Sequence, residues 1–240
     1  MKVSIAISTY EANGRGVELL SVNINTIMQQ TYKNIEIVIS DHSANADIQN
    51  YIDSVRSKCQ YDIIYVHNPE KRGNISHNIN NAINHCTGDI IKIIFMDDFL
   101  LKSTAIADIA FVFTQYPYTK WLVNSYLHTQ NYSSFYNPIY PKYNDQIITG
   151  RNTIGCPSGL TISKDVNVRF DENLKWFMDC EYYYQLFKLY GGPIIYQDDF
   201  LVGTLIHNAQ VTNSCVNNDA LINSETSYIN AKYGLTIVRS

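Results

Sequence analysis

The sequence predicts an α/β fold in which a mostly parallel central sheet is flanked by helices. Short apolar runs alternate with segments whose apolar residues recur at helical spacing, and this alternation is typical of βαβ units. The apolar runs in the first half are continuous, which favours parallel strands that are buried on both faces. Hydrophobic residues make up 45% of the 240-residue chain, which is ordinary for a globular protein with a sizeable core.

The first half of the chain carries the regular alternation. Four apolar runs predict strands at residues 3–9, 35–40, 61–67 and 89–96. A helical spacing of apolar residues runs from Leu19 to Met28, and another covers residues 73–86. Such units place successive parallel strands in one sheet and the helices over its faces.

The second half is less regular and predicts a mixed arrangement. We expect, in order, a strand at 122–126, a long polar loop at 129–158, a helix at 176–190, two short strands within 193–207 and a final helix at 217–233. No internal repeat and no low-complexity linker interrupts the sequence. We therefore expect a single domain over residues 1–240.

Charge and cysteine usage exclude several classes of protein. The formal net charge of -4 argues against a general nucleic-acid binder, which normally carries a basic surface. The five cysteines form no CxxC pair, which argues against a disulfide framework or a zinc site and fits a reducing cytoplasm. No apolar run reaches the roughly 20 residues that a membrane helix needs. We expect a soluble cytoplasmic protein without a transmembrane segment, and peripheral contact with a membrane is compatible with this.

Polar side chains follow three of the expected strands at the points where these strands end. They are Thr9-Tyr10-Glu11, Asp41-His42-Ser43 and Asp97-Asp98. Ligands of open parallel sheets bind at the carboxyl ends of the strands, so these residues indicate a site at that edge. Paired carboxylates suit a hard cation such as Mg²⁺ or Mn²⁺, which is commonly held together with substrate phosphates. The alternative for Asp97-Asp98 is a surface turn or the N-cap of a helix that begins near Ser103.

Four segments occur in an order that resembles the family 2 glycosyltransferases, which have the GT-A (Rossmann-like) fold. They are VSIAISTYE (3–11), IEIVISDHSANAD (35–47), RGNISHNINNAINHCTGDIIKIIFMDD (72–98) and FDENLKWFMDCEYYYQLFKLYGG (170–192). The resemblance covers about residues 1–110 and 155–207. It implies a nucleotide-sugar-binding half at 1–110 and a mixed acceptor-binding half, with the C-terminal helix, at 111–240.

The resemblance also implies where the donor nucleotide binds. The nucleotide-binding residues by this correspondence are Thr9, Tyr10, Glu11, Asp41, Arg72, Asn78 and Asp97. Asp41 matches the acid that accepts from the N3–H of a pyrimidine ring, so UDP- or dTDP-sugars are favoured. Read alone, Asp41 is equally compatible with a turn-capping acid, Arg72 with a solvated surface charge and Asn78 with a helix-surface amide.

A metal and a catalytic base follow from the same resemblance. Asp98 matches the carboxylate that holds Mn²⁺ or Mg²⁺, and His207 matches a histidine near the diphosphate. Phe99 stands where a third acid is usual and Leu205 where an arginine is common. Asp179 matches the catalytic base at the start of a helix, with Glu181 as the second choice. The alternatives are a core or surface role for His207 and a purely helix-capping role for Asp179.

We therefore expect an inverting, metal-dependent transfer of a sugar from a nucleotide diphosphate sugar to an acceptor hydroxyl. The acceptor class is a glycan, a lipid-linked molecule or a protein, with surface polysaccharide or glycan synthesis as the expected setting. One alternative is a nucleotidyltransferase, but that class needs a glycine-rich basic loop where STYEANGRG (8–16) has a single arginine. The other is a degenerate, non-catalytic module that binds a nucleotide or a sugar.

Overall fold

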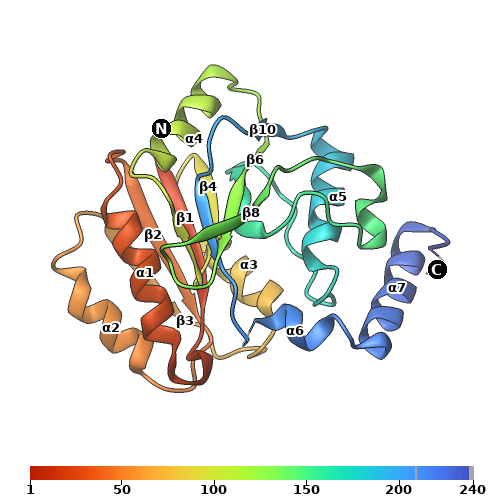
Figure 1. The fold of residues 1–240 in the computed structure, drawn as a ribbon, viewed down its shortest axis with the longest axis horizontal. Coiled ribbons are helices and arrows are strands. Elements are labelled where there is room, and N and C mark those ends of the chain that lie inside the picture. Colours follow the sequence, from red (N-terminus) through yellow and green to blue (C-terminus); the bar gives the residue numbers. More distant parts are fainter. Residues whose placement is uncertain (209, 238–240) are drawn as a thin grey trace.

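A computed structural model describes residues 1–208 and 210–237 and shows a central sheet between helices (Figure 1). The seven strands lie in the order β10-β6-β9-β4-β1-β2-β3. In chain order they are β1 (Val3–Thr9), β2 (Ile35–Asp41), β3 (Asp62–His67), β4 (Ile90–Phe95), β6 (Trp121–Asn124), β9 (Leu160–Ser163) and β10 (Ile194–Tyr196). All pairings are parallel except those of β9 with β4 and β6. The expected α/β fold with a mostly parallel sheet is confirmed.

Helices cover both faces of this sheet, as the continuous apolar strands require. One apolar core joins the sheet to α1 (Gly16–Met28), α2 (Asp47–Arg56) and α4 (Ala105–Gln115). The other joins it to α3 (Ile75–His85), α5 (Met178–Tyr190) and α7 (Asp219–Tyr233). Successive side chains of a strand point to opposite faces, so Ile5 and Ile7 enter the first core and Ala6 enters the second.

A second, four-stranded sheet stands beside the first, in the order β5-β11-β7-β8. Its strands are β5 (Asp98–Leu100), β7 (Tyr126–Thr129), β8 (Phe135–Ile139) and β11 (Val202–Leu205). This sheet lets the chain turn directly after β4, so Asp98 is itself a strand residue. The antiparallel pairing of β11 with β5 places Thr204 opposite Asp98.

The second half corrects two expectations from the sequence. The strand expected at 122–126 is two strands, β6 and β7, which belong to different sheets. The loop expected at 129–158 contains β8 and two short 3₁₀ helices, η2 (Asp145–Thr149) and η3 (Pro157–Gly159). β8 is an exposed edge strand with Pro138 in it, so its sequence lacks the apolar alternation of a half-buried strand.

The C-terminal elements mostly follow the expectation. The two short strands within 193–207 are β10 and β11, and the final helix is α7. A short helix, α6 (Val211–Cys215), precedes α7 and was not expected. None of the helices within 1–208 and 210–237 is both long and apolar enough to span a membrane.

Candidate active site

The carboxyl ends of β1 and β4 bring Tyr10 and Asp97 close together. Burial and the negative charge of Asp97 both raise the pKa of the Tyr10 hydroxyl. Tyr10 nevertheless keeps 39% of its surface exposed. An exposed aromatic ring beside a carboxylate provides one stacking surface and one polar anchor for a ligand at this edge.

Thr9 and Asn78 lie beneath this edge and hold it in place. Asn78 on α3 donates from Nδ2 to the Thr9 carbonyl at 3.0 Å and accepts from the Ser40 hydroxyl at 2.6 Å. Thr9 is fully buried and Asn78 nearly so. The Asn78 side chain therefore joins β1, β2 and α3 to one another, while the Thr9 hydroxyl contacts the sulfur of Met96 at 3.5 Å.

Asp41 closes the turn at the end of β2. Its Oδ1 accepts from the amide of Ser43 at 2.9 Å and from the Ser43 hydroxyl at 2.6 Å, and its Oδ2 accepts from the Tyr65 hydroxyl at 2.8 Å. The Asp41 side chain has no exposed surface. The nucleobase of a donor can contact this carboxylate only after Ser43 or Tyr65 moves.

Glu11 and Arg72 form an ion pair across the rim of the site. Arg72 also donates from Nε to the carbonyl of His42 at 2.9 Å. The pair thereby ties the turn after β1 to the turn after β2. Arg72 retains about half of its side-chain surface, so its guanidinium is accessible to an anion.

Asp98, the first residue of β5, and His207, just after β11, lie next to Asp97. Nε2 of His207, just beyond β11, lies 3.1 Å from Oδ2 of Asp97. Asp98 is 3% exposed, and burial together with the charge of Asp97 raises its pKa well above its usual range. Within the described residues, Asp98 Oδ1 and His207 Nδ1 are buried without a hydrogen-bond partner.

These two unpartnered atoms are the observation that bears on a metal. A carboxylate oxygen and an imidazole nitrogen are both suitable ligands for Mn²⁺. The described part of the chain, however, contains no group of three or more His, Cys, Asp or Glu side chains arranged around a metal position. A cation held by these two side chains would need its remaining ligands from a diphosphate and water.

Asp179 stands in the first turn of α5 and contacts the loop that precedes η3. Its Oδ2 accepts from Nδ2 of Asn152 at 2.7 Å and its Oδ1 accepts from the amide of Cys180 at 2.7 Å. Burial raises the pKa of Asp179 from 3.8 to about 6, and the bonds from Cys180 and Asn152 offset part of this rise. A carboxyl with such a pKa is ionised at neutral pH and can still take up a proton.

The C-terminal helix fixes the start of α5. Glu225 of α7 accepts from the amides of Lys175, Trp176 and Phe177, the three residues that precede the helix. This negative charge at a helix N-terminus is favourable because the amides point toward it. Glu225 thereby holds the backbone just before Asp179 in place.

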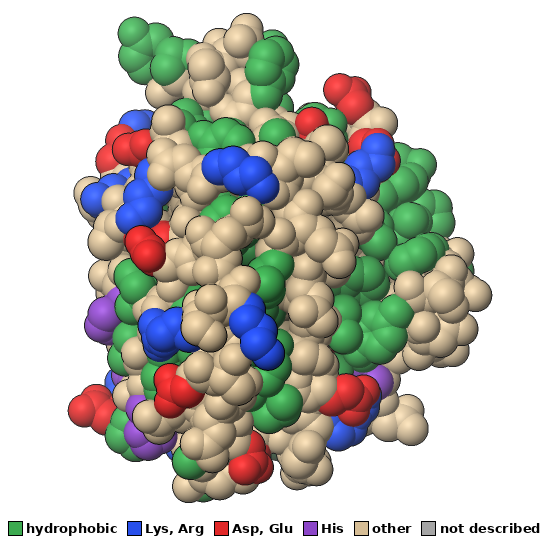
Figure 2. Space-filling model, turned by 90° about the vertical axis from the view of Figure 1, so that its left-hand side faces the viewer, with side chains coloured by type: hydrophobic (Ala, Val, Ile, Leu, Met, Phe, Trp, Pro, Cys, Tyr) green, Lys and Arg blue, Asp and Glu red, His purple; other side chains and the backbone are tan. Residues whose placement is uncertain are grey.

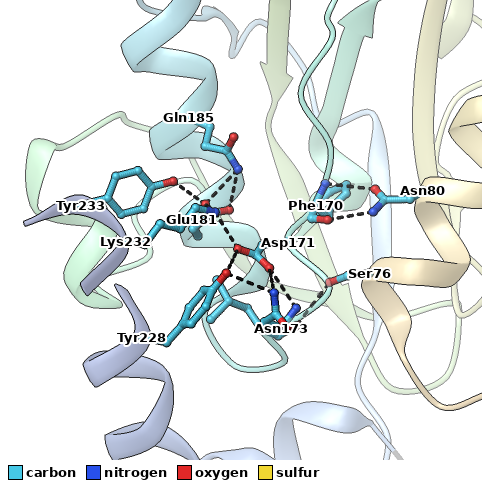
Figure 3. Close-up of polar contacts among 11 residues, drawn as sticks. Ser76, Asn80, Phe170, Asp171, Asn173, Glu181, Gln185, Tyr228, Lys232 and Tyr233 are labelled. Carbon is cyan, nitrogen blue, oxygen red and sulfur yellow. Dashed lines mark hydrogen bonds and ion pairs between the residues drawn. The ribbon is translucent and has the colours of Figure 1, made fainter. Parts of the chain in front are cut away.

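The same helix also binds Glu181. Figure 3 shows Lys232 and Tyr233 of α7 converging on Glu181 of α5, and Gln185 donates to it from one turn further on. Lys232 reaches Asp171 as well, at 2.6 Å. Glu181 is fully buried, so it has no surface at which an acceptor hydroxyl could meet it.

A cleft of about 590 Å³ opens beside Asn152. Its lining residues are Tyr126, Pro138, Ile139, Tyr140, Lys142, Asn144, Arg151, Asn152, Thr153 and Gly155. Gly155 has φ +99°, and a Cβ there would lie 1.9 Å from the Tyr126 hydroxyl. A second cavity of about 600 Å³, near Lys2 and Glu36, lies at the opposite ends of the strands, away from Asp97 and Asp98.

Two residues near the site were not singled out from the sequence. Asn152 lies in the expected loop, where nothing in its surroundings marks it. Lys92 interrupts the apolar run of β4, and this charge inside a strand is a signal that could have been used. It is fully buried, donates to Asn124 Oδ1 at 2.9 Å and to the Ser158 carbonyl at 2.5 Å, and burial lowers its pKa to about 7.

Comparison with known proteins finds one matching family model and several similar solved structures. The family model described as glycosyl transferase family 2 matches residues 4–169. No curated protein matches the sequence.

Solved structures share the fold at low identity. TarS of S. aureus is 16% identical with a TM-score of 0.63, and the match covers 97% of this chain and 44% of TarS. TarS 1-349 in complex with UDP-GlcNAc is 15% identical with a TM-score of 0.67, covering 98% of this chain and 68% of that one. The mannosyltransferase PcManGT from Pyrobaculum calidifontis, in complex with GDP-Man and Mn²⁺, is 14% identical with a TM-score of 0.62, covering 95% and 70%.

Proposed function

Because this chain belongs to glycosyl transferase family 2, we propose that it transfers a sugar from a nucleotide diphosphate sugar to an acceptor hydroxyl with Asp179 as the base. The observation that carries this proposal is the environment of Asp179. The carboxyl stands next to Asn152, a lining residue of the 590 Å³ cleft, and its pKa is raised to about 6. A general base works best when its pKa lies near the operating pH.

The proposed reaction displaces the diphosphate from the anomeric carbon. Asp179 takes the proton of the acceptor hydroxyl while the oxygen forms a bond to that carbon. The bond between the carbon and the diphosphate oxygen breaks, and the nucleoside diphosphate leaves with the electron pair. Attack from the face opposite the leaving group gives inversion, which we propose as the stereochemical outcome.

The donor is proposed to bind at the ends of β1, β2 and β4. Tyr10 and the Glu11–Arg72 pair form its rim, and Asp97 lies close to Tyr10. Asp98 and His207 would hold Mn²⁺ or Mg²⁺, which supplies positive charge to the departing diphosphate. Thr9 and Asn78 support this surface from below.

A uridine or thymidine base is proposed for the donor. Rotation of the Ser43 hydroxyl away from Asp41 would free a lone pair of Oδ1 for the N3–H of the ring. Tyr65 keeps the other oxygen in place through its 2.8 Å bond. A purine is larger, and cytosine has no N3–H to donate.

A panel of nucleotide sugars tests the activity. The purified protein is incubated with UDP-, dTDP- and GDP-sugars with and without Mn²⁺, and release of the nucleoside diphosphate is followed. We expect slow release from a uridine or thymidine donor, dependent on the metal. Saturable binding of a donor without any release would favour the non-catalytic binding module, and release of pyrophosphate from a nucleoside triphosphate would favour a nucleotidyltransferase.

A further inference from the structure

We infer that the cleft beside Asp179 binds an acceptor glycan that carries an anionic group, a phosphate or a carboxylate, near the hydroxyl that reacts. The inference rests on the proposed function, because it takes Asp179 as the base. It adds a substrate class to that function through two cations, Lys142 and Arg151, which line the cleft.

Contacts connect the lining of the cleft both to the proposed base and to the strand-end acid Asp98. Asn152 lines the cleft and donates to Asp179 at 2.7 Å. Tyr126 also lines it, and its hydroxyl accepts from the amide of Cys156 at 3.1 Å. The Cys156 sulfur contacts the hydroxyl of Thr204 at 3.4 Å, and Thr204 pairs with Asp98 across β11 and β5. The lining is therefore one hydrogen bond from Asp179 and is joined to Asp98 through Cys156 and Thr204.

The charged side chains that line the cleft are all positive. Lys142 and Arg151 are exposed, and the ten lining residues include no carboxylate. Arg151 donates to Gln146 Oε1 at 3.1 Å, and within the described residues neither Lys142 nor Arg151 has a carboxylate partner within 4 Å. On a chain of net charge -4, two cations left without partners in one cleft favour an anionic ligand.

The lining of the cleft also includes an exposed aromatic side chain, which suits a sugar ring. Tyr140 is 54% exposed, and its ring packs at 5.3 Å against Phe200. Pro138 and the nearly buried Tyr126 also line the cleft. Figure 2 shows apolar side chains gathered along its right-hand edge, the side on which β8 stands in front of the sheet in Figure 1. An exposed aromatic ring and two cations in one cleft match a sugar ring that bears a charged substituent.

Binding of simple glycosides tests the inference. Methyl α-glucoside, its 6-phosphate and methyl glucuronide serve as probes in saturation-transfer NMR titrations of the protein with UDP and Mg²⁺. We expect one or both charged glycosides to bind about ten- to a hundredfold more tightly than the neutral one, as for hydrogen bonds to charged groups. The two charged probes distinguish a phosphate from a carboxylate.

Variants locate the effect in the cleft. Lys142→Gln and Arg151→Gln should each reduce the preference for the charged glycoside, and the double variant should abolish it. Lys58→Gln removes an exposed cation on the distant α2 side and should leave the preference unchanged. Circular dichroism of each variant confirms that it is folded. Raised salt should weaken the preference because exposed cations are screened.

Three outcomes would overturn the inference. Equal affinity for the neutral and charged glycosides removes its basis, as does an unchanged preference in the double variant. Inorganic phosphate that binds as tightly as the 6-phosphate would indicate an ion site without a sugar subsite. Stabilisation by UDP and Mn²⁺ alone tests the donor site separately, so a failure of the proposed function is distinguishable from a failure of this inference.

Discussion

At the scale of single residues, four of the acids that the sequence singled out have different surroundings. Asp41 is enclosed by its own turn, Asp98 is buried beside Asp97, and Asp179 accepts two hydrogen bonds in a partly exposed position. Their positions at strand ends and at a helix start were predictable from the sequence. Their burial and partners depend on residues distant in sequence, such as Tyr65 and Asn152, and were not.

The pKa of Asp179 gives a prediction about stability. Its folded value of about 6 exceeds the ordinary 3.8, so the folded chain binds this proton more tightly than the unfolded chain does. The favourable contribution is complete below about pH 4 and is lost as pH rises through 6, by up to about 3 kcal/mol. Urea unfolding at several pH values should show the wild type losing stability relative to Asp179→Asn over this range.

Asp165 is the matched control for that series. Its hydrogen bond with Lys120 lowers its pKa. The wild type should therefore gain stability relative to Asp165→Asn as pH rises through the carboxyl range, which is the opposite of the trend for Asp179→Asn. If the difference in unfolding free energy between the wild type and Asp179→Asn stays constant from pH 4 to 7, the raised pKa of Asp179 is contradicted.

Asp41 gives a prediction about the nucleotide. We expect UDP to bind about ten- to a hundredfold more tightly than CDP, because a buried carboxylate facing a lone pair lacks a charged hydrogen bond. Asp41→Asn should shrink this ratio, since an amide presents either a donor or an acceptor. Ser43→Ala removes only the competing hydroxyl and should preserve the ratio. Equal affinity of the wild type for both nucleotides, measured by calorimetry, would exclude Asp41 from reading the base.

At the scale of elements, α7 determines how α5 is presented to the cleft. Glu225 binds the amides just before α5, while Lys232 and Tyr233 bind Glu181. The helical pattern of both elements was readable from the sequence. Their docking was not, because a Glu on a helix surface and a Glu that caps another helix have the same local sequence signal. The edge strand β8 was missed for a similar reason, since its residues are selected by pairing with β7.

The Glu225 contacts predict a loss of turnover from a residue that does not touch substrate. Glu225→Gln removes the charge that three amides share, so we expect the free energy of unfolding to fall by about 1–3 kcal/mol. Asp179 would be less well placed, so kcat should fall while donor affinity stays within a few-fold. Ser227→Ala, an exposed change on the same helix, is the control. Unchanged turnover and an unchanged pH profile in folded Glu225→Gln would restrict Glu225 to a structural role.

At the scale of the whole molecule, the two sheets divide the proposed work. The larger sheet presents the proposed donor surface at the ends of β1, β2 and β4. Residues of β7, of β8 and of the segment 140–155 line the proposed acceptor cleft. The repeated βαβ pattern made the first part predictable, because local periodicity specifies it. The second part depends on pairing between distant segments such as β5 and β11, and the local hydrophobic periodicity of the sequence does not reveal such pairing.

Ligand binding should stabilise the whole chain through the proposed metal site. Mn²⁺ should increase the stabilisation by UDP, and a ligand at 100 times its dissociation constant contributes about 2.7 kcal/mol. Asp98→Ala should abolish the Mn²⁺-dependent part in a thermal-shift assay while the protein stays folded. Asp53→Ala, an exposed acid on α2, is the control. A full Mn²⁺ effect in folded Asp98→Ala would exclude Asp98 as a metal ligand.

The central claim is that Asp179 takes the proton of the acceptor. The most direct measurement compares turnover of the preferred nucleotide sugar by the wild type and by Asp179→Asn, together with the donor dissociation constant of each. The amide keeps the shape of the carboxyl and cannot accept the proton. We expect turnover to fall by roughly 10²–10⁴ while the donor dissociation constant changes by no more than a few-fold. Turnover near the wild-type rate in Asp179→Asn would contradict the claim and place the base elsewhere.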